Sequence, residues 1–204
     1  MRRALQLAGF AVAAVFLLVL GAGLRPLFVA EPVSTAPALT ATELGFAQDM
    51  TAHHQQALIL AERLDPAADP VVRRLADQIA DSQRVELGTL LGWTQLAGAA
   101  PTTGEPMTWL AGTAGHHHDS AATMPGMATA AELDALSAAR GTDAETLFLQ
   151  LMYRHHSGGI TMARAADAIL TTGPVKQAAR AMAQTQSQEL GYLGTLLDAR
   201  GVHP

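Results

Sequence analysis

The chain contains no cysteine among its 204 residues. This absence excludes disulfide bonds, thiolate metal sites, haem attached through Cys-x-x-Cys-His and a lipidated N-terminal cysteine. Any soft metal ligand in this protein must therefore be a methionine thioether.

Aromatic and basic residues are also scarce. Aromatics make up 4% of the chain, and the abundance of Ala, Leu and Met favours helices over a β-sheet. Lys and Arg total 13 against 18 Asp and Glu, and without Arg2, Arg3 and Arg25 at the N-terminus the balance is 10 basic to 18 acidic, a net charge of -8. Phosphate binding needs a basic face, so a nucleic-acid partner is not expected.

The N-terminus carries an export signal. Residues 4–24 form an almost uncharged run that, at about 1.5 Å per residue, could span a hydrocarbon core of about 30 Å. Two Arg precede the run and one follows it, which predicts a body outside the cytoplasm. We expect residues 1–30 to be a retained membrane anchor in preference to a cleaved signal peptide, which would release a secreted or periplasmic protein. Residues 31–39 are predicted to form a linker.

The sequence of residues 40–61 is repeated at residues 142–163, at a constant offset of 102. Each copy is centred on Met-x-x-His-His, and the recurring residues are Thr40, Glu43, Phe46, Gln48, Met50, His53, His54 and Ala61, matched by Thr142, Glu145, Phe148, Gln150, Met152, His155, His156 and Ala163. Such recurrence indicates a duplicated unit whose two halves face each other.

Capping signals place the helices. Three capping boxes predict helix starts, at Thr40-x-x-Glu43, Thr129-x-x-Glu132 and Thr142-x-x-Glu145. We expect two helical hairpins, residues 40–97 and 142–200, joined by an irregular loop at 98–128 and a short helix at 129–140. Together they predict an all-α, four-helix bundle over residues 40–204.

The apolar periodicity of the four helices is interrupted at one level. Seams stepping by four and three residues carry His53 and His155 on the first helices, and the second helices carry Gln83, Glu86, Gln186 and Glu189 where the pattern asks for Leu. An unpaired buried polar group costs about 1–3 kcal/mol, so these side chains must satisfy one another, water or an ion.

Two interpretations of this polar level remain open. It could be a structural His–Glu layer that fixes the register between the hairpins. However, His54 and His156 lie about 100° round the helix from their neighbours, and a register layer does not need them. Met50 adjoins both His53 and His54 on the helix surface, and the second copy repeats this arrangement, which favours a metal site.

Ligand softness predicts the metal. Thioethers with imidazoles suit copper, Cu(I) with Met and His and Cu(II) with the imidazoles, while zinc remains an alternative through the imidazoles. A di-iron oxidase needs four carboxylates and two Glu-x-x-His motifs, and the seams offer only Glu86 and Glu189. We therefore expect no enzymatic activity. Non-covalent His/Met ligation of haem stays open.

The loop offers a second candidate metal site with the same chemistry. It gathers His and Met within a short stretch, a composition expected for copper capture in an oxidising compartment. The residues are Met107, His116, His117, His118, Asp119, Met124 and Met127.

Taken together, these motifs resemble the bacterial domain-of-unknown-function family 305. The resemblance rests on the phrases DMTAHHQQALILA and LMYRHHSGGITMA, the Gln-x-x-Glu second helices and MPGM before a capping box, and it covers about residues 40–200. It implies a ferritin-like bundle, and its characterised relatives are periplasmic or secreted copper-binding proteins linked to copper resistance. The implied ligands are Met50, His53, His54, Met152, His155 and His156.

The expected function is copper binding or buffering outside the cytoplasm, for copper homeostasis or resistance, with hand-over to copper-transport or envelope proteins. Partners that orient the imidazoles would be Gln83, Glu86, Gln186 and Glu189. The alternative is a non-catalytic envelope interaction module whose His/Glu layer is structural. The sequence leaves the oligomeric state open.

Overall fold

The computed structural model describes residues 2–28, 39–110 and 124–203, and it divides into two compact units, Met1–Ala36 and Pro37–Pro204. The first unit contains helix α1 (Arg2–Phe28). Among the residues whose side chains are described, no helix combines the length and the apolar character that a membrane crossing requires. The membrane anchor predicted for residues 1–30, and the membrane as a partner, are not shown.

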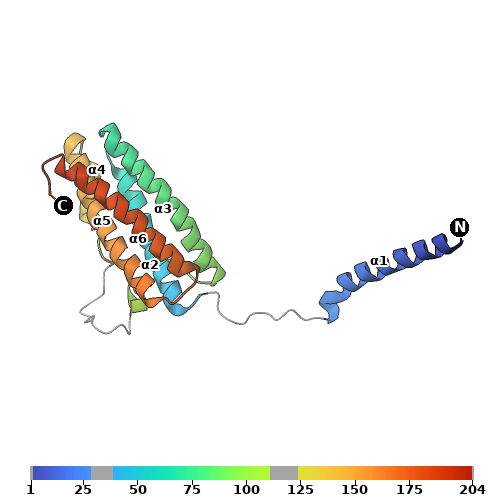
Figure 1. Cartoon of the computed structure of the whole chain (residues 1–204). Helices are drawn as coiled ribbons and strands as arrows, with labels where there is room; N and C mark the ends of the chain where they lie inside the picture. The colour runs from blue at the N-terminus through green and yellow to red at the C-terminus, as the bar shows by residue number, and fades with distance from the viewer. Residues whose placement is uncertain (1, 29–38, 111–123, 204) are drawn as a thin grey trace. The chain divides into compact units, whose positions relative to one another are not determined.

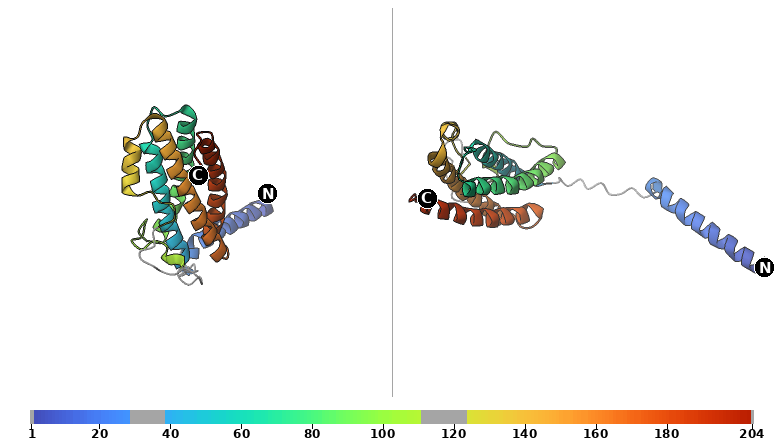
Figure 2. Two further views of the ribbon diagram at one scale, coloured as in Figure 1. Left: turned by 90° about the vertical axis from the view of Figure 1, so that its left-hand side faces the viewer. Right: turned by 90° about the horizontal axis from the view of Figure 1, so that it is seen from above.

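The second unit is built on four long helices, α2 (Ala41–Arg63), α3 (Pro70–Leu96), α5 (Gly141–Ile169) and α6 (Pro174–Asp198). Figure 1 and Figure 2 show these helices side by side. The short helix α4 (Ala130–Ala138) contacts α2 and α5, and a single 3-10 turn, η1 (Thr108–Leu110), contacts α2. Every regular element in the described ranges is a helix, which confirms the predicted all-α four-helix bundle.

Two of the three predicted capping boxes form. The Thr40 and Thr129 hydroxyls each accept the backbone N–H three residues on, and Glu43 and Glu132 close the boxes at 2.8 Å. The prediction for Thr142 and Glu145 was wrong, because α5 starts earlier, with Arg140 as its N-cap and no side-chain cap. The Glu145 carboxylate instead accepts from the Asp69 N–H at 2.8 Å and pairs with Arg200 at 2.9 Å.

The turns of both hairpins are held by the same interaction. In each, a basic side chain of the second helix donates a hydrogen bond to a carbonyl at the end of the first helix. Arg73 on α3 donates to the Ala61 carbonyl at 2.6 Å, near the end of α2. Lys176, its counterpart in the repeat, donates to the Leu170 carbonyl at 2.7 Å, at the end of α5. A cation at a helix C-terminus satisfies free carbonyls and the helix dipole, so this duplicated contact stabilises each turn.

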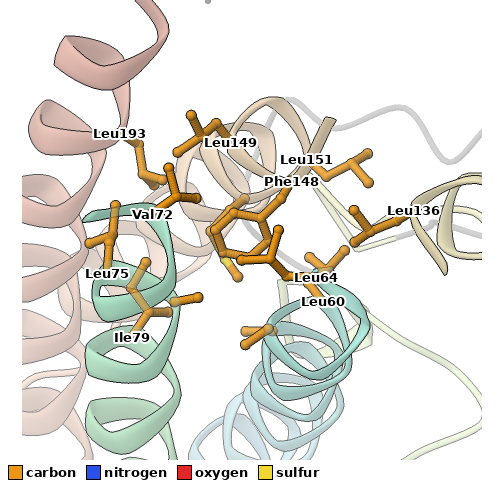
Figure 3. Close-up of a cluster of buried hydrophobic side chains, with 14 of the residues drawn as sticks. Leu60, Leu64, Val72, Leu75, Ile79, Leu136, Phe148, Leu149, Leu151 and Leu193 are labelled. Atoms are coloured by element: carbon orange, nitrogen blue, oxygen red, sulfur yellow. The ribbon is translucent and has the colours of Figure 1, made fainter. Parts of the chain in front are cut away.

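The core of the bundle consists of two apolar clusters. The leucine cluster, part of which Figure 3 shows around Phe148, includes Leu60, Leu64, Val72, Leu75, Ile79, Leu136, Leu149, Met152, Leu193 and Leu197. The methionine cluster includes Phe46, Met50, Leu90, Trp109, Met162, Val175, Ala179 and Met182. Along every long helix, the residues of the two clusters fall on opposite sides of the polar level predicted from the sequence.

Candidate metal centre

The polar level is a buried layer between the two clusters, which we call the histidine layer. It receives side chains from all four long helices. Its imidazoles are completely buried, and only Glu86 has a sizeable exposed fraction, 21% of its side chain. The histidine layer consists of His53, His54, Gln83, Glu86, His155, His156, Gln186 and Glu189.

In each hairpin, the second histidine of the His-His pair, which we call the outer histidine, contacts the glutamate of the second helix. His54 Nε2 lies 2.7 Å from Glu86 Oε2, and His156 Nε2 lies 2.8 Å from Glu189 Oε2. Glu189 has a further donor, the Ser82 hydroxyl at 3.2 Å. A carboxylate on Nε2 fixes the orientation of the ring, which is the arrangement that carboxylates give to metal-binding histidines.

The two inner histidines come together at the centre of the layer. The ring centroids of His53 and His155 are 3.8 Å apart, with the planes tilted by 34°. His155 Nε2 lies 2.9 Å from the His53 carbonyl, and His53 Nε2 lies 3.2 Å from the Pro125 carbonyl. The seam positions predicted for these residues therefore meet across the interface between α2 and α5.

All four imidazoles present the same nitrogen without a protein partner. Each Nε2 faces a carbonyl or a carboxylate oxygen, which can only accept, so Nε2 carries the ring proton. In the neutral ring Nδ1 then has a lone pair, and the four Nδ1 atoms are buried and unpartnered. A neutral imidazole with a free lone pair and an anchored N–H is a competent metal ligand.

Burial keeps the inner imidazoles neutral. It lowers the pKa of His53 to about 3, with the nearby His54 acting in the same direction. Burial also lowers the pKa of His155 well below its ordinary value, and the neighbouring histidines add to this effect. Neutral rings are the form in which imidazole binds metals.

The side-chain amides of the two glutamines of the layer have no hydrogen-bond partner. Both amide atoms of Gln83 and of Gln186 are buried and unpaired. Gln186 lies against the backbone of α5, since a Cβ at Gly159 would stand 2.3 Å from its Oε1 and 3.0 Å from His53 Cε1. Gly159 thus makes the room that brings this amide next to the inner histidine of the other hairpin.

A short strap formed by residues 124–128 closes over the layer. At one end of the strap, the Pro125 carbonyl contacts His53. At the other end, the side-chain amide of Gln56 on α2 donates to the Ala128 carbonyl at 2.9 Å and accepts from the Ala128 N–H at 2.6 Å. Between these ties, Gly126 has a φ of 81° and lies directly on Gly158 of α5. Neither the capping signals nor the apolar periodicity of the sequence predicts this contact.

Substitution of Gly158 by alanine is expected to destabilise the domain by about 1–3 kcal/mol, because the new Cβ would lie 2.0 Å from the Pro125 carbonyl oxygen. Urea unfolding would measure the loss. The matched control is Gly88→Ala on α3, where a Cβ meets nothing within 4 Å, and a gain of about 0.5–1 kcal/mol is expected there. Equal effects of the two substitutions would contradict the tight seating of the strap.

The thioethers of the two motifs lie on opposite sides of the histidine layer. Met50 belongs to the methionine cluster with Met162 of α5, whereas Met152 belongs to the leucine cluster with Leu60 of α2. This follows from the antiparallel arrangement of α2 and α5. The predicted ligand set is thus gathered in one region, but its two sulfur atoms face different halves of the core.

The second predicted site is only partly within the described residues. Met107, Met124 and Met127 are partly buried, and the first two pack against the methionine cluster. His116, His117, His118 and Asp119 lie outside the described residues. Within the described ranges, no group of three or more His, Asp or Glu side chains is already arranged to hold a metal ion.

Comparisons with known proteins identify relatives of this chain. Residues 43–197 match the family described as Domain of unknown function (DUF305). A family protein from Streptomyces coelicolor, described as predicted to be secreted, is 37% identical, with 79% of this chain and 94% of that chain covered and a TM-score of 0.70. A DUF305 fragment from Deinococcus radiodurans is 31% identical, with 78% and 97% covered and a TM-score of 0.64.

A more distant structure, CopM in the Cu(I)-bound form, shares the fold at 22% identity, with 78% of this chain and 98% of that chain covered and a TM-score of 0.58. No curated protein matches the chain. The family match extends over most of this sequence, and nearly the whole length of the Streptomyces coelicolor structure aligns with this chain. The chain belongs to the DUF305 family.

Proposed function

We propose that this protein binds copper in the histidine layer and acts outside the cytoplasm as a copper buffer or carrier. The observation that supports this proposal best is the set of four buried Nδ1 atoms with no protein partner, on rings whose Nε2 protons are all engaged. The proposed ligands are His53, His54, His155 and His156 with Met50 and Met152, and the proposed orienting partners are Gln83, Glu86, Gln186 and Glu189.

A purely structural layer accounts less well for these atoms. All but one of the buried side-chain nitrogen and oxygen atoms that lack a hydrogen-bond partner in the described residues belong to the histidine layer, the exception being Arg73 Nε. Each such group costs about 1–3 kcal/mol, and a layer that served only as a register would pair them with one another. An ion bound by the Nδ1 atoms would offset this cost.

Donor chemistry favours copper over other metals. Imidazole nitrogen suits Cu(II) and zinc, whereas thioether sulfur adds affinity for Cu(I) and little for zinc. Because the layer is not preassembled, the rings must turn about their side-chain torsions to converge on one ion. The Glu86 and Glu189 contacts would hold the outer rings during this movement.

Two relatives agree with this proposal. The Streptomyces coelicolor protein is described as predicted to be secreted, which fits an extracytoplasmic location, and CopM has been solved in Cu(I)-bound and Cu(II)-bound forms. A protein in that location would receive and release copper in exchange with transport or envelope proteins. The alternative, an envelope interaction module with a structural layer, predicts no metal in the purified protein.

Competition between metals tests the proposal directly. The full-length protein loaded with Cu(I) is expected to keep the metal against a chromogenic chelator when zinc is added in excess, because zinc gains little from the thioethers. Displacement of Cu(I) by zinc would assign the site to zinc. Retention of neither metal would favour the interaction module.

A further inference from the structure

The methionines of this chain are concentrated on one side of the histidine layer. Met50, Met162 and Met182 are buried in the methionine cluster, and Met107 and Met124 pack against it from its partly exposed edge. On the other side of the layer Met152 is the sole thioether among the described cluster members, and leucines fill most of the remaining large positions, with Ile79 and Phe148. Leucine and methionine have similar volumes, so packing alone does not explain this asymmetry.

Met107 is held in an unfavourable backbone conformation. Its φ of 65° makes it the one non-glycine residue with positive φ among those described. The left-handed region is costly for a side chain of this size, and such outliers persist where the surrounding structure imposes them. The strain thus points to a requirement for this side chain at this place.

A buried carboxylate imposes the conformation. Asp49, 1% exposed, accepts the Met107 N–H at 2.7 Å and the Trp109 indole N–H at 2.8 Å. The indole in turn packs edge-on against Phe46, with ring centroids 5.5 Å apart, and over Gly45, where a Cβ would meet Trp109 at 2.8 Å. Asp49 directly precedes Met50, so the residue on α2 that holds Met107 is the chain neighbour of a thioether of the histidine motif.

The methionines of the cluster range from partly exposed residues at its edge to a buried residue beside the histidine layer. Met107 and Met124 are partly exposed, while Met50 is fully buried and lies one helical turn from His53. Met124 also precedes Pro125, whose carbonyl contacts His53. A neutral cluster of sulfur donors attracts a soft monovalent cation and discriminates against Cu(II) and zinc, which prefer nitrogen and oxygen.

We propose that the methionine cluster is a second, Cu(I)-selective binding region, with Met107 and Met124 as its solvent-side ligands and Met50 as its connection to the histidine layer. The proposal rests on the proposed copper function for its metal. It adds a site that does not need the imidazoles, and it gives Cu(I) a second position in the bundle, apart from the histidine layer.

Binding measurements on full-length variants test the proposal. In an H53L/H155L background, Cu(I) binding measured anaerobically against a chromogenic chelator is expected to persist, and adding M107L/M124L should weaken it by at least about tenfold, since even the loss of a ligand's partner costs about 10–100-fold. G88A in the same background is the control, because this substitution on an exposed face of α3 meets nothing within 4 Å, and it should leave Cu(I) affinity unchanged. M107L/M124L alone should not alter Cu(II) binding.

Methionine methyl spectra of the wild-type protein provide a readout that does not depend on the folding of any variant. Addition of Ag(I), a diamagnetic substitute for Cu(I), should shift the methyl resonances of Met107, Met124 and Met50. Unshifted Met107 and Met124 methyls, or unchanged Cu(I) affinity when M107L/M124L is added to H53L/H155L, would overturn the second site while Cu(II) binding by the histidine layer upholds the first. A wild-type protein that binds no copper would overturn both.

Discussion

Saturating Cu(II) is expected to raise the melting temperature of the wild-type protein by about 5–11 °C, and the H53L/H155L variant should show no such shift. A ligand at a hundred times its Kd stabilises the folded state by about 2.7 kcal/mol, and in a chain of this size each kcal/mol moves the melting temperature by about 2–4 °C. His53 and His155 belong to different hairpins, so an ion that binds both ties the two halves together.

Leucine is the suitable replacement at these positions. Both rings are fully buried, and alanine would leave a cavity whose cost would obscure the loss of the ion. Leucine fills a similar volume and removes an unpaired Nδ1 at the same time. Differential scanning calorimetry with and without Cu(II) would measure the shift, which thioethers should not sustain because Cu(II) prefers nitrogen.

Two control variants make the result specific. His203 is 90% exposed, so H203L should keep the full shift. Alanine at His116, His117 and His118 should lower the copper stoichiometry and leave the shift intact if the loop binds copper independently. The same shift in H53L/H155L as in the wild type would show that the inner histidines have a structural role alone.

The sequence predicted the bundle and its polar layer because both depend on local patterns. Steps of four and three residues determine which side of a helix is buried, and the repeat showed that His53 and His155 occupy equivalent positions. Glu86 lies near the edge of the buried layer, with 21% of its side chain exposed, whereas His53 lies inside it and is completely buried. Periodicity therefore sufficed to bring these residues to one level.

The pairing within the layer was beyond such patterns. The seams placed the glutamates at the level of the inner histidines, yet Glu86 and Glu189 contact the outer ones, His54 and His156. The rotation of each helix about its axis decides this choice, and tertiary packing sets that rotation. Glu145 was predicted as part of a helix cap, but α5 starts before Thr142, and Glu145 instead binds Arg200 and the backbone N–H of Asp69 before α3.

Two glycines in the sequence of α5 indicate close contacts there, one of them with the strap. Gly158 and Gly159 stand in the middle of α5 where the first copy has Gln56 and Ala57, and each mid-helix glycine costs about 1 kcal/mol relative to alanine. Such a cost indicates a close approach by another group. The structure shows two, the Pro125 carbonyl at Gly158 and the Gln186 amide at Gly159.

Acid is expected to destabilise the metal-free protein strongly below about pH 6.5. In the unfolded chain a histidine titrates near pH 6.5, whereas burial lowers the pKa of His53 to about 3 and that of His155 well below its ordinary value. Their contribution to stability is thus complete above about pH 6.5 and is lost as the pH falls toward the folded pKa. Each imidazole removes up to about 1.4 kcal/mol per pH unit, so the pair should remove about 3–4 kcal/mol between pH 6.5 and 5.

Urea unfolding at pH 7.5, 6 and 5 would measure this loss, which is large for a domain whose total stability is about 5–15 kcal/mol. Glu132 does not titrate in this window, because the Arg154 guanidinium holds its pKa at about 2. H53L/H155L should flatten the dependence, and H203L should leave it unchanged. A wild-type stability that is constant from pH 7.5 to 5 would show that the inner rings accept protons in the fold, and the lone pairs that the proposed metal site requires would then be occupied by hydrogen.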